Sequence, residues 1–511
     1  MTEGPIRDLL VIGGGINGCG IARDAAGRGL SVLLCETDDL AAGTSSASTK
    51  LIHGGLRYLE HFEFRLVRAS LTEREVLLRN APHIIWPLRF VLPHDSGQRP
   101  AWMIRLGLFL YDHLGGREIL PRSESLDLSH GDYGAPLAPA FRRGFAYSDC
   151  WVDDARLVVL NALDASERGA AVRTRTELVS ARRDGTLWIA ELRDRRTGRS
   201  ETVRARALVN AAGPWAAEIL HGRLGEPGEP ELRLVKGSHI VVPRLYAGEH
   251  AYIFQNPDKR VVFAIPYESD FTLIGTTELD YRGDPAAAEI EDLEIDYLLA
   301  VIARCFRKTV GREAIVWSFS GVRPLYDDRH RSASAVTRDY VFDLDAPRDE
   351  APLLSIFGGK ITTYRKLAEH ALTRLQPRLG FSERRWTAAA PLPGGDIPGA
   401  DFAAFLADLR RRRPWLPEPL ARRYARAYGT RVERLLGGAN ALVDLGADLG
   451  EGLYEAELEY LRAQEWAVTM EDLLWRRSKL GLHISAATRG RLAEWLGEAG
   501  PQVSAHDRAA K

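Results

Sequence analysis

The sequence predicts an α/β (α+β) protein of two or three domains, and three observations support this class. Residues 9–36 follow a β–α–β pattern, which is typical of a parallel sheet. Residues 232–325 contain short alternating and apolar runs, the pattern of an antiparallel sheet. Residues 400–500 have no strand-like runs and are rich in Arg, Leu, Ala and Glu, so we expect helices there. A chain of 511 residues is too long for one core.

The β–α–β unit carries a dinucleotide fingerprint. An apolar strand leads directly into G-x-G-x-x-G, formed by Gly13, Gly15 and Gly18, and a helix-like run and a second strand follow. The first glycine permits a sharp turn, the second lets the backbone approach a pyrophosphate, and the third lets helix and strand pack closely. Glu36 ends the second strand, where it can accept hydrogen bonds from a ribose diol. This order predicts a Rossmann-like domain that binds FAD or NAD.

Composition excludes several classes of protein. Hydrophobic residues make up 45% of the chain and charged residues 27%, as in ordinary globular proteins, and the net charge of −1 argues against nucleic-acid binding. Four scattered cysteines predict neither a zinc site nor a disulfide scaffold, and we expect no metal. The amino terminus lacks the features of a signal peptide, and no apolar run is long enough for a membrane span. We therefore expect a cytoplasmic protein.

A second segment is more specific than the fingerprint. Residues 37–50 are small and hydroxyl-rich, as in a linker, but they run without a break into 51–60, L-I-H-G-G-L-R-Y-L-E. T-S-S at 44–46 and residues 50–60, which add Lys50 to this segment, closely resemble the FAD-dependent (aerobic, respiratory) glycerol-3-phosphate dehydrogenase family. The resemblance covers residues 7 to 490. Further matching segments are 210–215, 236–239, 321–325 and 357–365.

The resemblance implies FAD, a fold like that of D-amino-acid oxidase, and oxidation of sn-glycerol 3-phosphate to dihydroxyacetone phosphate. Hydride would pass to FAD and electrons to membrane quinone. A covalent flavin link at His53 is an alternative to the non-covalent FAD that we expect. The positions that match the family's cofactor site are Gly13, Gly14, Gly15, Asn17, Gly18, Glu36, Thr44, Ser45, Ser46, His53, Gly54, Gly55, Val179, Ala212, Gly213, Gly359, Lys360, Ile361 and Thr362.

Glycerol 3-phosphate presents a dianion, which requires fixed cations. By resemblance, Arg57, Tyr58, Thr276 and Arg338 bind substrate, while His239, Arg323 and Lys360 are catalytic. His239 is the candidate base, because a neutral imidazole is available near pH 7; the alternative is a satisfied histidine on a strand. Arg323 and Lys360 would stabilise negative charge that develops during the reaction. Any one of 68 Lys and Arg residues could instead be a solvated surface residue.

Residues 102–111 form a strongly apolar run among arginines. The alternatives are a core helix and a segment at the membrane interface. The resemblance favours the second, because the bacterial dehydrogenases are peripheral proteins that reduce membrane quinone. We therefore expect a homodimer on the inner leaflet of the cell membrane, and we expect Leu108→Asp with Leu110→Asp to weaken its lipid binding.

Three other functions stay open: an oxidase that uses oxygen, a flavoprotein that does not oxidise alcohols, and an amine-oxidising relative. The oxidases, by resemblance, carry an insertion that is not evident here. The expected division of the chain is a FAD-binding domain in three parts (1–80, 151–231 and 331–388), a cap or membrane-interface segment (81–150), a substrate domain (232–330) and a C-terminal helical domain (389–511).

Overall fold

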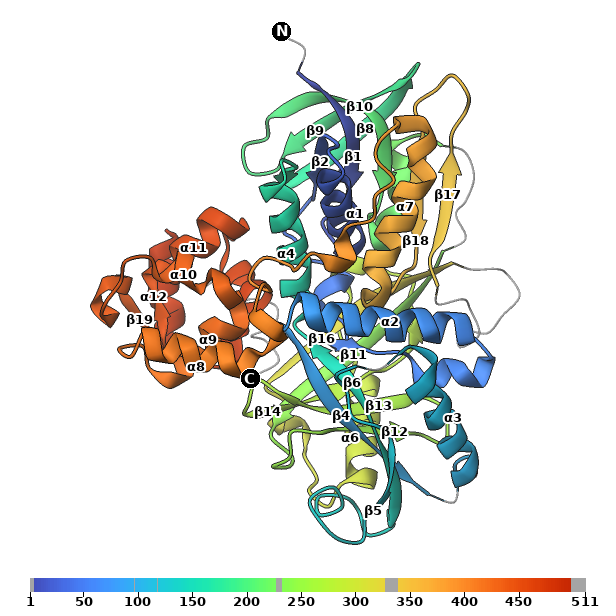
Figure 1. The fold of residues 1–511 in the computed structure, drawn as a ribbon, viewed down its shortest axis with the longest axis vertical. Helices are drawn as coiled ribbons and strands as arrows, with labels where there is room; N and C mark the ends of the chain where they lie inside the picture. Colours follow the sequence, from blue (N-terminus) through green and yellow to red (C-terminus); the bar gives the residue numbers. More distant parts are fainter. Residues whose placement is uncertain (1–3, 96, 117, 227–231, 327–338, 498–511) are drawn as a thin grey trace.

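The computed structural model of the protein describes residues 4–95, 97–116, 118–226, 232–326 and 339–497. Two mixed sheets lie one beyond the other along the long axis, and a helical domain lies at their side (Figure 1). Both sheets are assembled from segments that are far apart in the sequence.

The first sheet has eight strands and contains the predicted β–α–β unit. Its strands are β1 (Ile6–Ile12), β2 (Val32–Cys35), β7 (Ala171–Arg173), β8 (Thr176–Asp184), β9 (Leu187–Asp194), β10 (Ser200–Asn210), β17 (Val341–Asp345) and β18 (Leu353–Phe357). The main order is β17-β18-β10-β1-β2-β7, with β8 and β9 added to β10. Strand β1 pairs in parallel with β2 and β10, and Leu9 to Val11 are fully buried, as the apolar run predicts.

Three helices cover one face of this sheet (Figure 1). They are α1 (Ile16–Gly27), α4 (Asp154–Glu167) and α7 (Tyr364–Leu379). Helix α1 contacts both of the others. At the start of α4, the Asp153 side chain accepts a hydrogen bond from the Arg156 backbone N–H, which satisfies one of the unpaired donors of the first turn.

The second sheet has ten strands. They are β3 (Leu51–Ile52), β4 (Ile85–His94), β5 (Glu124–Asp127), β6 (Arg143–Val152), β11 (Leu232–Pro243), β12 (Ala251–Gln255), β13 (Val261–Tyr267), β14 (Phe271–Gly275), β15 (Leu279–Asp280) and β16 (Trp317–Tyr326). The main order is β15-β11-β14-β13-β12-β4-β6-β3, with β16 on β11 and β5 on β6. Segments 81–150 and 232–330, which the sequence analysis separates, therefore share one sheet. Helix α6 (Asp292–Cys305) packs against β11.

Helix α2 (Phe64–Asn80) lies between the two sheets in Figure 1, and α3 (Ala101–Leu114) contacts it. Helix α3 contains the apolar run and is amphipathic. Trp102, Met103, Leu106 and Phe109 are 66%, 37%, 51% and 53% exposed, whereas Leu108 is fully buried. The expected Leu108→Asp test is therefore wrong in its choice of residue, because that side chain faces the core. Among the described residues, no helix is both long and apolar enough to cross a bilayer.

The C-terminal part of the chain is helical, as expected, and also contains one short hairpin that the sequence analysis missed. Its helices are α8 (Phe402–Arg412), α9 (Glu418–Tyr428), α10 (Val432–Leu436), α11 (Glu455–Glu465) and α12 (Ala486–Leu496), and its strands are β19 (Asp448–Gly450) and β20 (Leu453–Tyr454). A buried ion pair between Arg156 of α4 and Glu465 of α11 joins this domain to the first sheet's helices.

Candidate active site

The turn between β1 and α1 has the geometry that the fingerprint predicts. Gly13 has a φ of +108°, a conformation that side-chain-bearing residues rarely adopt. A Cβ on Gly18 would lie 2.0 Å from the Gly13 carbonyl oxygen, so only glycine fits where the helix passes the strand. The Glu36 carboxylate accepts hydrogen bonds from the backbone N–H groups of Gly14 (2.6 Å) and Asp38 (2.8 Å). Burial raises the pKa of Glu36 to about 6.

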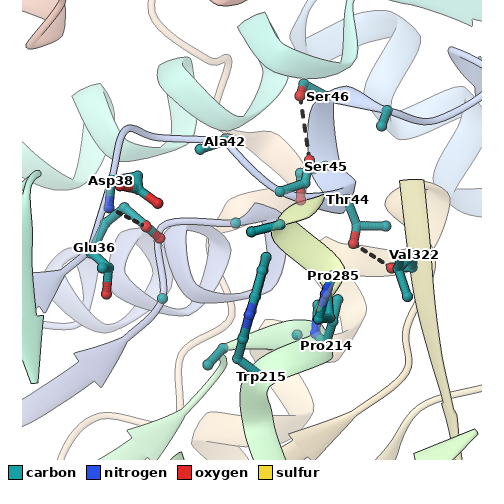
Figure 2. A pocket seen from close by; sticks show the side chains of 18 of the residues that line it. Glu36, Asp38, Ala42, Thr44, Ser45, Ser46, Pro214, Trp215, Pro285 and Val322 are labelled. Carbon is teal, nitrogen blue, oxygen red and sulfur yellow. Dashed lines mark hydrogen bonds between the residues drawn. The ribbon is translucent and has the colours of Figure 1, made fainter. Parts of the chain in front are cut away.

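A cavity of about 670 Å³ opens beside this turn. Figure 2 shows Glu36 and Asp38 on one side and Thr44 on the other, with Trp215 pointing toward the loop that carries Ala42. The Thr44 hydroxyl donates to the Val322 carbonyl (2.5 Å). The predicted cofactor residues that line this cavity are Gly13, Gly15, Asn17, Glu36, Thr44, Ser45, Ser46, Ala212, Gly213 and Gly359.

The cavity fits a dinucleotide. Its floor is the glycine turn and the amino end of α1, where free N–H groups and the helix dipole favour a pyrophosphate. The Ser45 hydroxyl holds this end of the helix by accepting from the Ile16 N–H (3.0 Å). The lining includes small residues such as Gly43, Ala47 and Gly321, where a flat ring system can lie against the backbone. These residues would hold the adenosine, the diphosphate and the flavin of FAD.

Some predicted cofactor residues lie elsewhere. Among the described residues, Gly14, Gly18, Gly54 and Val179 line neither this cavity nor the second one, although the Leu178 side of β8 does reach the first. The Val179 carbonyl instead accepts from Arg223 (3.4 Å). The remaining predicted cofactor residues, which line the second cavity, are His53, Gly55, Lys360, Ile361 and Thr362.

The second cavity, of about 330 Å³, adjoins the first and shares Thr44, Ser45 and Gly359 with it. Four cationic side chains from distant segments line it: Arg57, Arg260, Arg323 and Lys360. Among the described residues, three acids also line this cavity: Asp149, Glu278 and Asp339. Cations therefore outnumber acids in the described lining, which favours an anionic substrate of a few carbon atoms.

The predicted substrate residues are held by close contacts. The Lys360 Nζ lies 3.7 Å from the centre of the Tyr58 ring, a cation–π contact. The Arg323 guanidinium donates to the Thr276 hydroxyl (3.4 Å). Gly237 leaves room for both groups, since a Cβ there would lie 2.7 Å from each. The structure thus brings together four of the predicted substrate and catalytic residues in two contacting pairs.

His239 lies behind the wall of the second cavity. Its side chain is 1% exposed and stacks on Phe319, with ring centroids 4.8 Å apart. Its Nε2 lies 3.0 Å from the Thr49 hydroxyl, and Thr49 does line the cavity. Burial, and then the positive charges of Arg323 and Lys50, lower the pKa of His239 well below its usual value of 6.5. The imidazole is therefore neutral at pH 7, and Thr49 separates it from the cavity.

Arg338 lies outside the described residues. Thr49, Arg260 and the acids Glu278 and Asp339 also line the second cavity, although none of them was predicted from the sequence. Thr49 lies between the two matched segments 44–46 and 50–60, and this position could have marked it as a site residue. Arg260 ends a turn, where its guanidinium contacts the Asp258 carboxylate (2.8 Å) and the Tyr297 ring (3.7 Å), and no sequence pattern marks it.

The chain is similar to known families and to known proteins. A family model described as FAD dependent oxidoreductase matches residues 8–365, and one described as the C-terminal domain of alpha-glycerophosphate oxidase matches residues 385–502. A glycerol-3-phosphate dehydrogenase from Pseudomonas aeruginosa is 58% identical over 96% of this chain and 95% of its own. A D-erythritol 1-phosphate dehydrogenase from Brucella abortus is 54% identical over 98% of this chain and 99% of its own.

Among solved structures, the glycerol-3-phosphate dehydrogenase from Bacillus halodurans complexed with FAD is similar, with a TM-score of 0.76 and 29% identity. The match covers 97% of this chain and 92% of that one. The predicted fold and the predicted cofactor, FAD, are thereby confirmed.

Proposed function

The chain belongs to the FAD-dependent glycerol-3-phosphate dehydrogenase family, and from that membership we propose that it oxidises sn-glycerol 3-phosphate to dihydroxyacetone phosphate. The observation that carries the proposal is the four-cation cavity that adjoins the FAD cavity. A phosphate dianion would bind to this cluster, and its carbon chain would extend toward the shared residues Thr44, Ser45 and Gly359.

In the reaction, bound FAD supplies the hydride acceptor for carbon 2 of the substrate. The protein must hold that carbon in place and remove the hydroxyl proton. We assign the proton to a relay: the substrate hydroxyl gives its proton to the Thr49 oxygen while the Thr49 proton passes to Nε2 of His239. Because the pKa of His239 is lowered, its imidazole is neutral at pH 7 and can accept this proton. Arg323 and Lys360 would stabilise the negative charge on the substrate oxygen as the proton leaves.

An anaerobic titration tests this function. Glycerol 3-phosphate should bleach the visible absorbance of the bound flavin, whereas amino acids should not. Bleaching by an amino acid alone would favour an amine oxidase, and no bleaching by any substrate would favour a flavoprotein that does not oxidise alcohols.

D-erythritol 1-phosphate is a second candidate substrate, because a relative of that name matches almost the whole chain. The same titration distinguishes the two, since the true substrate should give the larger ratio of reduction rate to half-saturating concentration. A larger ratio for the erythritol ester would replace the glycerol ester as the proposed substrate.

We also propose that the electrons go to membrane quinone from a position on the inner leaflet. The support is the exposed apolar face of α3 (Trp102, Met103, Leu106 and Phe109), which Phe62 and Phe64 extend at 78% and 40% exposure. Exposed Arg99 and Arg105 flank this face, and cations near anionic headgroups contribute on the order of 1 kcal/mol each. The alternative acceptor is oxygen. Quinone in vesicles should reoxidise the enzyme much faster than dissolved oxygen, and the reverse result would identify an oxidase.

A homodimer completes the proposal, and sedimentation equilibrium of the holoenzyme tests it. A mass twice that of the chain is expected, and a monomer mass would contradict it.

A further inference from the structure

The C-terminal domain contributes a wall to the FAD cavity. Glu471, Trp475, Arg476 and Lys479 line that cavity, and all four belong to the segment that contains the π-helix Asp472–Arg477. We propose that this segment, hereafter the clasp (residues 471–479), is part of the FAD site, and that docking of the C-terminal domain is coupled to FAD binding. The inference rests on the cofactor alone and does not depend on which alcohol is oxidised.

The clasp contributes positive charge to the FAD cavity. Among the described residues that line the cavity, three side chains are cationic: Arg223, Arg476 and Lys479. Two of the three belong to the clasp. The rest of the lining is acidic, with Glu36, Asp38, Glu177, Glu218 and Asp284, and the clasp itself adds one acid, Glu471. A FAD diphosphate carries two negative charges, so the clasp supplies most of the positive charge that offsets them.

Ion pairs fasten the clasp to the other side of the cavity. Arg476 donates from Nε to Asp39 (2.7 Å) across the cavity and, within the clasp, from a terminal nitrogen to Asp472 (2.5 Å). Arg477 donates twice to Asp39 (2.7 Å each). Arg175 donates to Asp472 (2.5 Å). Asp39 follows the lining residue Asp38 and Arg175 precedes the lining residue Thr176, so these pairs connect the clasp to the ribose end of the cavity.

The clasp also contacts the second sheet. Trp475 stacks on Trp317 of β16 with ring centroids 4.3 Å apart and an angle of 21°, and both rings line the FAD cavity. The Lys479 ammonium donates to the Trp475 carbonyl. One segment of nine residues therefore spans the cavity wall from Asp39 to β16, and removing it would open that wall to solvent.

Two neighbouring arginines, Arg476 and Arg477, allow the loss of a cavity charge to be tested separately from the loss of docking. Arg476→Gln removes a charge from the cavity. Asp39 keeps Arg477 and Asp472 keeps Arg175 as partners, whereas Glu471 loses its 3.6 Å contact with Arg476. Arg477 is fully buried, and among the described lining residues it is absent from the cavity. Arg477→Gln therefore weakens docking without removing a lining charge. Arg462→Gln, at an exposed position paired with Glu459, is the matched control.

The measurements are FAD affinity of the apo-protein by flavin fluorescence, its dependence on NaCl, and the thermal midpoint of the apo-protein. Arg476→Gln should weaken FAD binding about 10- to 100-fold with little change in the apo midpoint, and should flatten the dependence on NaCl. Arg477→Gln should lower both affinity and apo midpoint, because coupling is reciprocal. Arg462→Gln should match wild type.

Wild-type affinity in Arg476→Gln overturns the inference, and so does equal loss of affinity in the Arg462→Gln control. A second measurement uses the unmodified chain: FAD should slow proteolysis of wild-type protein in the connection between α7 and α8, residues 380–401, and in the clasp. Equal cleavage rates with and without FAD would show that docking and cofactor binding are independent, whether or not the variants fold.

Discussion

Gly237→Ala should damage substrate handling without loss of FAD. The new Cβ would lie 2.7 Å from both the Arg323 terminal nitrogen and the Thr276 hydroxyl. This distance is about 0.7 Å shorter than 3.4 Å, where ordinary van der Waals contact begins. The guanidinium is the flexible partner, so it should move. Loss of one charge-assisted contact costs about 1.5–3 kcal/mol, and a displacement of this size can also disturb alignment, so kcat/KM should fall roughly 10- to 150-fold.

The assay is turnover of glycerol 3-phosphate with a soluble dye, together with FAD content and thermal midpoint. FAD content should stay normal, because Gly237 is not among the described residues that line the FAD cavity. Gly490→Ala in α12 is the matched control, since its Cβ would have no neighbour within 4 Å. A normal kcat/KM in Gly237→Ala would refute the placement of Arg323 and Thr276 at the substrate.

Three further predictions follow from the geometry. Gly18→Ala should give apo-protein without flavin absorbance, because its Cβ would lie 2.0 Å from the Gly13 carbonyl oxygen; a normally loaded variant would contradict the close approach of α1 to β1. Partial burial, and then the neighbouring Asp153 carboxylate, raise the pKa of Glu268 from 4.5 to about 7, although its side chain is 33% exposed. Its contribution to stability is therefore complete below pH 4.5 and is lost as pH rises through 7. The thermal midpoint of wild type should fall more between pH 5 and pH 8 than that of Glu268→Gln, and parallel curves would exclude this group. Trp102→Asp with Leu106→Asp should reduce vesicle sedimentation but preserve dye turnover, whereas Val443→Asp, at an 80% exposed site in the C-terminal domain, should leave both unchanged. Unchanged sedimentation of the double variant would remove α3 from the lipid contact.

The parts of the fold that the sequence predicts are those whose signal is local. The turn at Gly13, the helix after it and the acid Glu36 lie within 28 residues, and each demands a particular residue type. The pairing of β4 with both β6 and β12 has no such signal, because the paired residues are 49 to 67 positions apart for β6 and 161 for β12. For this reason segment 81–150 could not be assigned to the second sheet. The hairpin β19–β20 is too short for its alternation to stand out.

The orientation of α3 was available in the sequence. Trp102, Leu106 and Phe109 are spaced four and three residues apart and share one face, whereas Leu108 lies on the face that Tyr111 shares. The candidate site, in contrast, could be predicted only in part from the sequence. Family motifs led to Arg57, Arg323 and Lys360, but Arg260 joins them only because the fold of β12 and β13 brings its turn to the same cavity.

The strand order of the first sheet also governs when this protein can fold during its synthesis. On one edge, strand β10 pairs with β1, which the ribosome delivers early. On the other edge, Ser200–Ala205 pair with β9, and Leu208–Asn210 pair with β18. Strand β18 emerges about 145 residues after β10, a delay of roughly 7–30 s at ~5–20 residues per second. During that interval a nascent chain of more than 200 residues presents the unpaired edge of Leu208–Asn210. Chaperone binding to the nascent chain should therefore be strongest between the emergence of β10 and that of β18, and a truncation before β18 should aggregate.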